Sequence, residues 1–322
     1  MGANHARLYA EMPDVELVAV ADPDPSRPAI VPRYDDYLRM LDEVRPQAIS
    51  VCVPTRAHFE VAAACIERGI ATLVEKPLAA TIDEGERLRD LAASANVTLA
   101  VGHVERFNPA VIELKHRLEA GELGRVYQMH ARRVGPFPQR IRDVGVVLDL
   151  APHDIDVMRF LLGSEIARVQ AETEQRIATD REDMLSGVLR FENGVVGVLD
   201  VNWLTPTKIR ELSVLGERGM FVVDYLAREL TFFENAAATI SSSDPAWASR
   251  HEKGVTEGAR IEIPIEKREP LRSELEAFVA AVRGEVPVAV TADDGLAAMR
   301  AAEALIASAA RGSPIAVGGA AS

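Results

Sequence analysis

Cysteine and long apolar runs are scarce in this chain of 322 residues. It has two cysteines, Cys52 and Cys65, and no uninterrupted apolar run that would span a bilayer. Without Cys-x-x-Cys spacing, two cysteines argue against a disulfide framework and against the common cysteine-rich zinc sites. The first residues also lack the basic, apolar and small-residue succession of a signal peptide. We therefore expect no metal site and a cytoplasmic location.

Basic residues are also in short supply. Thirty-six lysines and arginines stand against 49 acidic residues, which leaves a formal net charge of −13. A chain with this charge repels the anionic backbone of nucleic acids and anionic membrane surfaces. Hydrophobic residues make up 48% of the chain, enough for a large core. We expect two domains and no nucleic-acid or membrane partner.

The first third of the chain alternates between apolar runs of strand length and segments of helical character. Buried strands are expected at 15–21, 48–53, 72–74 and 97–102, and helices at 4–12, 34–43, 58–68 and 82–95. Thr81 and Glu84 form a capping-box pattern before the last of these helices. Strands without polar alternation, separated by helices, are typical of a parallel, doubly wound sheet.

The start of the chain carries part of a dinucleotide-binding motif. In such sheets the first strand leads into Gly-x-Gly-x-x-Gly, and an acidic residue about 20 positions later binds the ribose. Gly2 fits the last glycine and Asp22 the acidic residue, whereas the first strand and the two earlier glycines would lie upstream of Met1. Either the start codon is assigned too late or the domain is shortened. We predict a Rossmann-type domain over 1–122 that lacks its first strand. Asp22 would repel a 2′-phosphate, which favours NAD over NADP.

Glu75-Lys76-Pro77 follows the strand at 72–74. Proline biases the residue before it toward extended geometry, so Lys76 is expected at the carboxyl end of a parallel strand. Ligands of open α/β sheets bind at that edge. The alternative is a lysine in an ordinary surface turn.

Beyond Gly102 the pattern changes. A helix is expected from Asn108-Pro109 to about Gly121, and strands at 125–134 and 166–177. Hairpins are expected at 185–203, turning at Asn193-Gly194, and at 212–233. Residues 236–260 read as a loop, and helices at 271–283 and 293–311 end the chain. We predict a second domain over 123–322 with an open, mainly antiparallel sheet, and C-terminal helices from about 271 that pack on the domains.

Asp149 and His153 lie four residues apart, so on a helix they share one face. A carboxylate beside an imidazole orients the ring and raises its basicity, as a general base requires. Pro152 is expected to mark the start of the helix, with Asp149 just before it. In the structural alternative, Asp154 and Asp156 cap this helix and complement its dipole, and His153 has a hydrogen-bond partner without a catalytic role. The pattern by itself is equally compatible with both.

Four arginines precede this segment, at positions 132, 133, 140 and 142. In an acidic protein, such a cluster beside a candidate site suggests a substrate that carries phosphate. A solvated loop whose arginines pair with nearby acids is the alternative.

Together, these motifs resemble the glucose–fructose oxidoreductase/inositol dehydrogenase/rhizopine-catabolism (Gfo/Idh/MocA) family. The resemblance implies a Rossmann domain, a C-terminal α/β domain with an open sheet, and a nicotinamide-dependent sugar or polyol dehydrogenase. It also implies homo-oligomers formed through that sheet. More narrowly, residues 101–109 and 140–149 are similar to members described as UDP-N-acetylglucosamine 3-dehydrogenases.

On this basis we predict NAD-dependent oxidation of a sugar hydroxyl to a ketone, on a nucleotide-linked sugar such as UDP-N-acetylglucosamine at carbon 3. His153 would take the hydroxyl proton, Lys76 would hydrogen-bond the same oxygen, and Asp149 would orient substrate or His153. An inositol or simple-sugar dehydrogenase, or a non-catalytic sugar- or cofactor-binding protein, are the alternatives. Residues expected to line the cofactor site are Gly2, Asp22, Pro54, Thr55, His58, Glu75 and Lys76. Those expected to line the substrate site are His103, Arg106, Asn108, Arg140, Arg142, Asp149 and Asp156.

Overall fold

The structure is a computed structural model that describes residues 1–138, 144–177, 181–237 and 255–317. It divides into two compact units. The first joins Met1–Phe107 with Arg268–Arg300, and the second joins Asn108–Lys267 with Ala301–Ser322. The predicted domain boundary after residue 122 stays a prediction, because compactness does not show which segments fold independently. No helix in the described part of the chain combines the length and the apolar composition that crossing a membrane requires.

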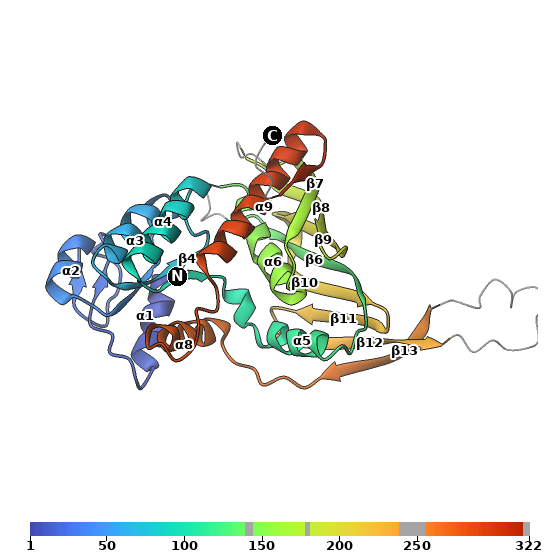
Figure 1. Cartoon of the computed structure of the whole chain (residues 1–322), viewed down its shortest axis with the longest axis horizontal. Helices are drawn as coiled ribbons and strands as arrows, with labels where there is room; N and C mark the ends of the chain where they lie inside the picture. Colours follow the sequence, from blue (N-terminus) through green and yellow to red (C-terminus); the bar gives the residue numbers. More distant parts are fainter. Residues whose placement is uncertain (139–143, 178–180, 238–254, 318–322) are drawn as a thin grey trace, which may run out of the picture. The chain divides into compact units, whose positions relative to one another are not determined.

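The first unit is built around three parallel strands in the order β3-β4-β5 (Figure 1). Val51 pairs with Val74 across the first two strands, and Val74 pairs with Val101 across the next two. A separate parallel pair, β1-β2, lies in the same unit. The elements are α1 (Gly2–Glu11), β1 (Val20–Ala21), β2 (Arg33–Tyr34), α2 (Tyr37–Val44), β3 (Ala48–Val51), α3 (His58–Ile66), β4 (Ala71–Glu75), α4 (Ile82–Ala95), β5 (Leu99–Gly102) and α8 (Pro270–Val282), with the first half of α9 (Ala292–Arg311).

Thr81 is confirmed as the N-cap of α4. Its Oγ1 accepts a hydrogen bond from the backbone N–H of Glu84 at 3.2 Å, while the Glu84 carboxylate accepts from the N–H of Ala80, one residue before the cap. The helix ends at Asn96, whose φ of 52° lies in the left-handed region. Asparagine tolerates this conformation better than most residues, so the predicted bounds 82–95 agree with the structure.

The predicted strand at 15–21 is wrong over most of its length. Only Val20 and Ala21 form a strand, and their partners are Arg33 and Tyr34. In the described residues, β3 pairs on one side only and three of its four residues are half-buried, whereas β4 has neighbours on both sides and is almost wholly buried. In the described residues β1 likewise pairs on one side only, with β2. Without a second neighbour it lacks the hydrogen bonds and cross-strand packing that would extend the strand back to residue 15.

The second unit contains a nine-stranded sheet in the order β13-β12-β11-β10-β6-β9-β8-β7-β14. All neighbouring strands run antiparallel except β6 and β9, which are parallel. The strands are β6 (Val126–Pro136), β7 (Ile166–Glu174), β8 (Met184–Phe191), β9 (Val196–Asn202), β10 (Leu204–Gly216), β11 (Gly219–Asp224), β12 (Glu229–Ala237), β13 (Val255–Ile263) and β14 (Ile315–Ala316). The helices are α5 (Pro109–Glu119), α6 (Val146–Leu162) and the second half of α9.

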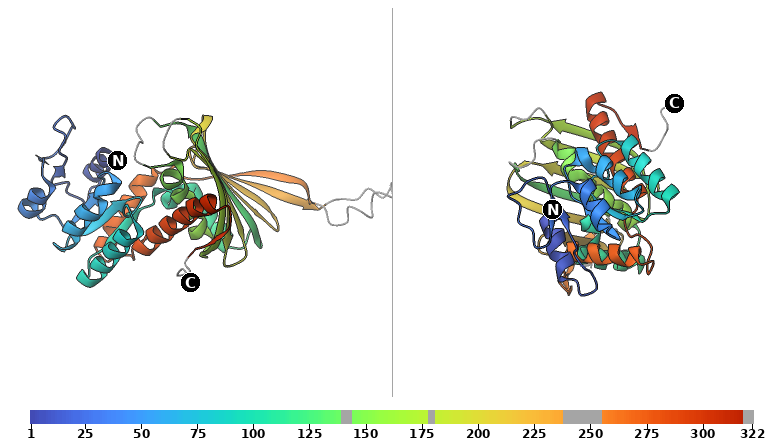
Figure 2. Two further views of the ribbon diagram at one scale, coloured as in Figure 1. Left: turned by 90° about the horizontal axis from the view of Figure 1, so that it is seen from above. Right: turned by 90° about the vertical axis from the view of Figure 1, so that its left-hand side faces the viewer.

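The helices of this unit cover one face of the nine-stranded sheet (Figure 2). Buried and exposed residues alternate along β8, where Leu185 and Leu189 are fully buried and Val188 between them is 48% exposed. This alternation is typical of an antiparallel sheet with one face on a core. The other face is therefore open in the described chain.

Two predictions about this sheet are corrected. The hairpin at Asn193-Gly194 is confirmed, with Gly194 at a φ of 87°. The hairpin predicted at 212–233 is confirmed at its turn, where β10 and β11 pair antiparallel with Gly216 opposite Gly219, but β11 ends at Asp224 and the residues from Glu229 onward belong to β12. The loop predicted for 236–260 is wrong at its end, where residues from Val255 onward form β13, and residues 238–254 lie outside the described chain. Residues from Val255 onward form a strand because they pair with β12. The local composition does not reveal this partner.

Candidate functional site

Lys76 lies directly after β4, at the carboxyl end of the buried parallel strand, as the sequence predicts. The peptide bond between Lys76 and Pro77 is cis. The His58 ring sits between two backbone carbonyls of this edge, with Nδ1 at 2.7 Å from the Pro77 oxygen and Nε2 at 3.0 Å from the Val53 oxygen. The ring thus ties the segment after β3 to the segment that carries Lys76.

In this position the His58 ring has a structural role. The side chain is 1% exposed, and burial lowers its pKa although both neighbouring carbonyls favour the protonated ring. Pro54 and Thr55 lie between β3 and α3, at the start of a short 3-10 turn, Thr55–Ala57. Their contact with cofactor, and that of His58, stays a prediction.

The α1 N-terminus and Asp22 belong to the same unit. Met1 precedes α1 and makes no side-chain capping hydrogen bond. A Cβ placed on Gly2 would lie 3.7 Å from Cys52 Cβ, in the segment after β3. Asp22 follows β1, and its Oδ1 accepts a hydrogen bond from the N–H of Asp24 at 2.9 Å.

His103 and Arg106 follow β5 and are both buried. Arg106 forms an ion pair with Asp294 at 2.8 Å and donates to the carbonyl of Ala289 at 3.3 Å. Burial alone raises the pKa of Asp294, but the hydrogen bond and charge of Arg106, with donation from Thr291, lower it to about 2. Substrate contact by His103 and Arg106 stays a prediction.

In the second unit, α6 carries Asp149, His153 and Asp156. The helix begins at Val146, so the prediction that it starts at Pro152 is wrong. Proline removes only one helical hydrogen bond, and the buried face of α6 outweighs that loss. Asp154 and Asp156 are consequently buried in mid-helix and are not caps.

The α6 N-terminus is held by a distant acid. The N–H of Val147 donates to Glu182 Oε1 at 3.3 Å, and the N–H of Val146 donates to the Glu182 backbone oxygen at 2.9 Å. A Cβ on Gly145 would come within 2.1–2.3 Å of the Glu182 carboxylate, so a side chain at this position would displace the carboxylate from the helix start. Negative charge at this end also complements the helix dipole.

Asp149 and His153 form a polar strip on an otherwise buried helix. Both are half-buried, while Leu150, Ala151, Pro152 and most of the later residues are buried. Residues at i and i+4 lie on the same helical face, so the carboxylate and the imidazole project from one side. This arrangement agrees with the predicted acid–base pair, although their catalytic roles stay predictions.

A buried ion pair fixes α6 to the sheet and is not among the contacts predicted from the sequence. Arg133 Nε and Nη2 donate to the two Asp154 oxygens at 2.6 and 2.9 Å, and both side chains are almost fully buried. The Arg133 guanidinium also lies 5.1 Å from the centre of the Tyr225 ring. Along β6, Arg133 is in phase with the buried Met129 and Ala131. That phase is a signal that the arginine needs a buried acidic partner.

The arginine cluster is thus divided. Arg132 points to the other face, where it pairs with Asp200 at 3.5 Å and both side chains are exposed. Arg140 and Arg142 lie outside the described residues.

Asn108 caps α5 through Oδ1, and its Nδ2 donates to the Tyr225 carbonyl at 3.1 Å. These bonds hold Asn108 in place, and its contact with substrate stays a prediction.

Known proteins match the chain over most of its length. The model of the oxidoreductase family with an NAD-binding Rossmann fold matches residues 1–103, and that of the GFO/IDH/MocA C-terminal domain matches residues 111–222. An inositol 2-dehydrogenase of Saccharopolyspora erythraea is 32% identical over 97% of this chain and 91% of the relative. The chain belongs to the Gfo/Idh/MocA family.

Two further members are informative. The UDP-N-acetylglucosamine 3-dehydrogenase of Acidithiobacillus ferrooxidans is 29% identical over 93% of this chain and 90% of its own. A solved structure of that enzyme superimposes with a TM-score of 0.81, covering 95% of this chain and 93% of the other. The WlbA dehydrogenase of Bordetella pertussis, solved with NADH and UDP-GlcNAcA, has a TM-score of 0.79, covers 99% of this chain and 96% of its own, and at 21% identity shares the fold.

Membership in the Gfo/Idh/MocA family confirms the predicted fold class, the oxidoreductase class and NAD as cofactor. The residues present fit a dinucleotide. The uncapped α1 N-terminus offers backbone N–H groups and a positive dipole end to a pyrophosphate, and Gly2 has no side chain to obstruct it. Asp22, after β1, supplies the carboxylate that a ribose requires.

Proposed function

We propose that the protein is an NAD-dependent dehydrogenase that oxidises a hydroxyl of a sugar to a ketone. The observation that carries this proposal is the strip of Asp149 and His153 on α6, in a chain that places Lys76 at the carboxyl end of β4. A base, an orienting carboxylate and a hydrogen-bond donor are the protein groups that alcohol oxidation requires.

In the proposed reaction, His153 accepts the proton of the sugar hydroxyl. The Lys76 ammonium donates a hydrogen bond to the same oxygen and stabilises the negative charge that develops on it. Asp149, one turn before His153 on α6, orients the imidazole or a neighbouring sugar hydroxyl. NAD, when bound, supplies the acceptor for the hydride that leaves the carbon.

The proposed substrate is a nucleotide-linked sugar such as UDP-N-acetylglucosamine, oxidised at carbon 3. Support comes from the 29% identical relative with that activity and from the arginines before α6. Because Arg132 and Arg133 are paired with Asp200 and Asp154, Arg140 and Arg142 are the candidates for the diphosphate. UDP-sugars should turn over faster than the free sugars, and Arg140→Ala should raise KM for UDP-sugars alone.

An inositol dehydrogenase is the second candidate, favoured by the 32% identical relative. It predicts turnover of phosphate-free polyols and no effect of Arg140→Ala. Comparing UDP-N-acetylglucosamine, N-acetylglucosamine and myo-inositol with the same enzyme preparation separates the two candidates.

Cofactor binding is tested before any substrate, by titrating NADH and NADPH and following nicotinamide fluorescence. We expect NADH to bind more tightly than NADPH, because the Asp22 carboxylate repels a 2′-phosphate. Asp22→Ala should weaken NADH binding and reduce this preference, while Asp24→Ala, two residues further in the same loop, serves as the control. If neither dinucleotide binds, the dehydrogenase proposal fails for this chain and a non-catalytic binding protein remains.

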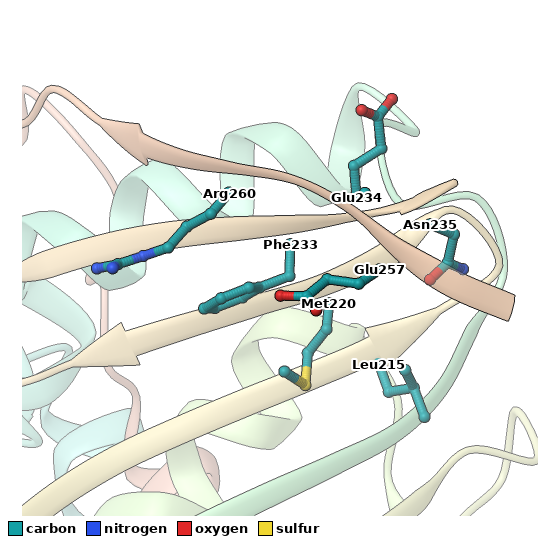
Figure 3. Close-up of a pocket in the computed structure, with 8 residues that line it drawn as sticks. Leu215, Met220, Phe233, Glu234, Asn235, Glu257 and Arg260 are labelled. Carbon is teal, nitrogen blue, oxygen red and sulfur yellow. The ribbon is translucent and has the colours of Figure 1, made fainter. Parts of the chain in front are cut away.

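We also propose that copies of the chain associate through the open face of the nine-stranded sheet. Apolar residues of neighbouring strands gather on that face, among them Leu215, Met220 and Phe233, which line a shallow hollow of about 270 Å³ (Figure 3). Val188 is 48% exposed and Leu215 40%. A Leu215→Asp/Val188→Asp variant should shift the mass in sedimentation equilibrium to that of a monomer.

The cytoplasmic location predicted from the sequence is tested separately, by cell fractionation.

A further inference from the structure

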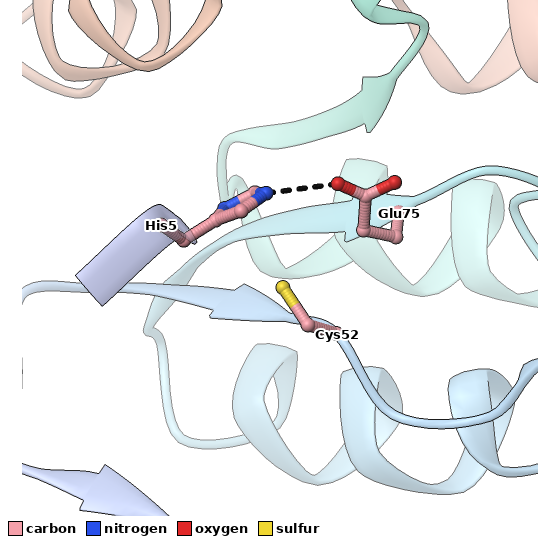
Figure 4. A group of neighbouring side chains, drawn as sticks. All are labelled: His5, Cys52 and Glu75. Carbon is pink, nitrogen blue, oxygen red and sulfur yellow. Dashed lines mark hydrogen bonds and ion pairs between the residues drawn. The ribbon is translucent and has the colours of Figure 1, made fainter. Parts of the chain in front are cut away.

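Three side chains that could hold a metal ion meet in the first unit: His5, Cys52 and Glu75 (Figure 4). They come from α1, from the segment after β3 and from the end of β4. One ligand atom of each lies within 4.8 Å of the other two. His5 Nε2 and Glu75 Oε1 are already 2.8 Å apart.

The cluster is buried and chemically mixed. The side chains of His5 and Glu75 are 3% and 12% exposed, and Cys52 is a free, half-buried thiol. Within the part of the chain that the structure describes, the second ring nitrogen of His5, Nδ1, is buried and has no hydrogen-bond partner. Burial, and then the nearby charge of Glu75, raises the pKa of Cys52 to about 12, so the thiol stays protonated without a metal.

We propose that His5, Cys52 and Glu75 form a site for Zn²⁺. One thiolate, one imidazole nitrogen and one carboxylate oxygen are the ligand types that zinc selects, whereas Mg²⁺ and Ca²⁺ prefer oxygen alone. Ligand atoms around a tetrahedral zinc lie about 3.3–3.8 Å apart, so His5 Nε2 and Glu75 Oε1, at 2.8 Å, must separate slightly. Three protein ligands leave the fourth position to water.

Binding exchanges a proton for the metal. The Cys52 thiol loses its proton to solvent and coordinates as thiolate, whereas the His5 ring coordinates as neutral imidazole, with its proton on Nδ1 and the lone pair of Nε2 directed at zinc. Affinity should therefore rise with pH. Because the ligands come from a helix and two strand ends, the ion would cross-link α1 to the edge of the parallel sheet and raise the melting temperature.

The cluster has no signature in the sequence. Its members stand at positions 5, 52 and 75, without the short spacing by which zinc sites are found, and the sequence analysis accordingly expected no metal. The parallel sheet brings them together, because the carboxyl ends of neighbouring strands share one edge.

The test uses tag-free protein and Co²⁺ as a spectroscopic substitute for zinc. Thiolate coordination gives a near-ultraviolet charge-transfer band, which we expect in the wild type and which Zn²⁺ should abolish by competition. Cys52→Ala should remove the band and the rise in melting temperature. Cys65→Ala is the matched control, since Cys65 is a free, buried thiol of the same unit outside the cluster and should leave both unchanged.

Glu75→Gln provides a second variant that keeps the shape of the side chain and a hydrogen-bond acceptor for His5. It should weaken Co²⁺ binding at least tenfold while circular dichroism stays that of the wild type. Absence of the band in folded wild type, or its persistence in Cys52→Ala, would overturn the site. Neither readout depends on dehydrogenase activity, so the proposed function can fail without affecting this result.

Discussion

The two sheets of this protein bring their polar side chains together in different ways. In the first unit, the strands β3, β4 and β5 are parallel and apolar, and the candidate polar residues Glu75 and Lys76 lie at the carboxyl end of β4. In the second unit, the strands are mainly antiparallel, and the candidate residues Asp149 and His153 stand on a helix that covers the sheet.

The difference shows where a buried charge requires an ion-pair partner. At the end of a strand, Lys76 and its neighbours follow the apolar residues and do not interrupt them. On α6, nearly every position is buried, and the acidic Asp154 is tolerated because Arg133 reaches it from the sheet. In the second unit, a buried ion pair therefore anchors to the sheet the helix that carries the candidate residues.

The largest expected effect is catalytic. In the proposed mechanism Lys76 is the hydrogen-bond donor and His153 the base, so Lys76→Met and His153→Ala should each lower kcat by about 10²–10⁴-fold. Steady-state rates with NAD and the best sugar substrate measure this. His116→Ala, on the exposed side of α5, is the control. Wild-type rates in either variant would remove that residue from the mechanism.

The next effect compares two adjacent arginines on opposite faces of β6. Arg133→Met should destabilise the second unit by about 3–5 kcal/mol, because Asp154 is left as a buried, unpaired carboxylate. Arg132→Met breaks the exposed pair with Asp200 and should cost less than about 1 kcal/mol. Urea midpoints followed by circular dichroism provide the measurement. Equal midpoints in the two variants would show that the buried ion pair contributes no more to stability than the exposed one.

A third effect depends on pH and belongs to the first unit. Because the folded-state pKa of Asp294 is lowered to about 2, its ionised form stabilises the fold above the ordinary pKa of an aspartate. We expect about 2 kcal/mol at neutral pH, lost as pH falls from about 4 to about 2. Asp294→Asn should be less stable than the wild type at pH 7, and the difference should vanish near pH 2. A difference that does not vary with pH would contradict this account.

The smallest effect compares a local helix cap with a distant one. Thr81→Ala removes the side-chain cap of α4 and should cost about 1 kcal/mol. Ser94→Ala, near the other end of α4, should change stability by less than about 0.5 kcal/mol. Glu182→Gln, which keeps the acceptor at the start of α6 but loses the charge, should fall between these values. Thermal unfolding compares all three, and a Thr81→Ala value no larger than that of Ser94→Ala would argue against capping.

The sequence by itself determined those features that depend on neighbours in the chain. The bounds of α4, the turn at Asn193-Gly194 and the position of Lys76 after a buried strand follow from caps, from a positive φ and from an apolar run before proline. The four-residue spacing of Asp149 and His153 likewise predicted a shared helical face.

Only the tertiary structure decided the features that depend on distant residues. Pro152 lies inside α6 because packing outweighs one lost hydrogen bond, and Val255 onward is a strand because β12 pairs with it. The same holds for the partner of Arg133 and for the meeting of His5, Cys52 and Glu75. Local patterns carry no information on which distant side chain will fill a given space, and burial, pairing and charge compensation are settled only when the whole chain packs.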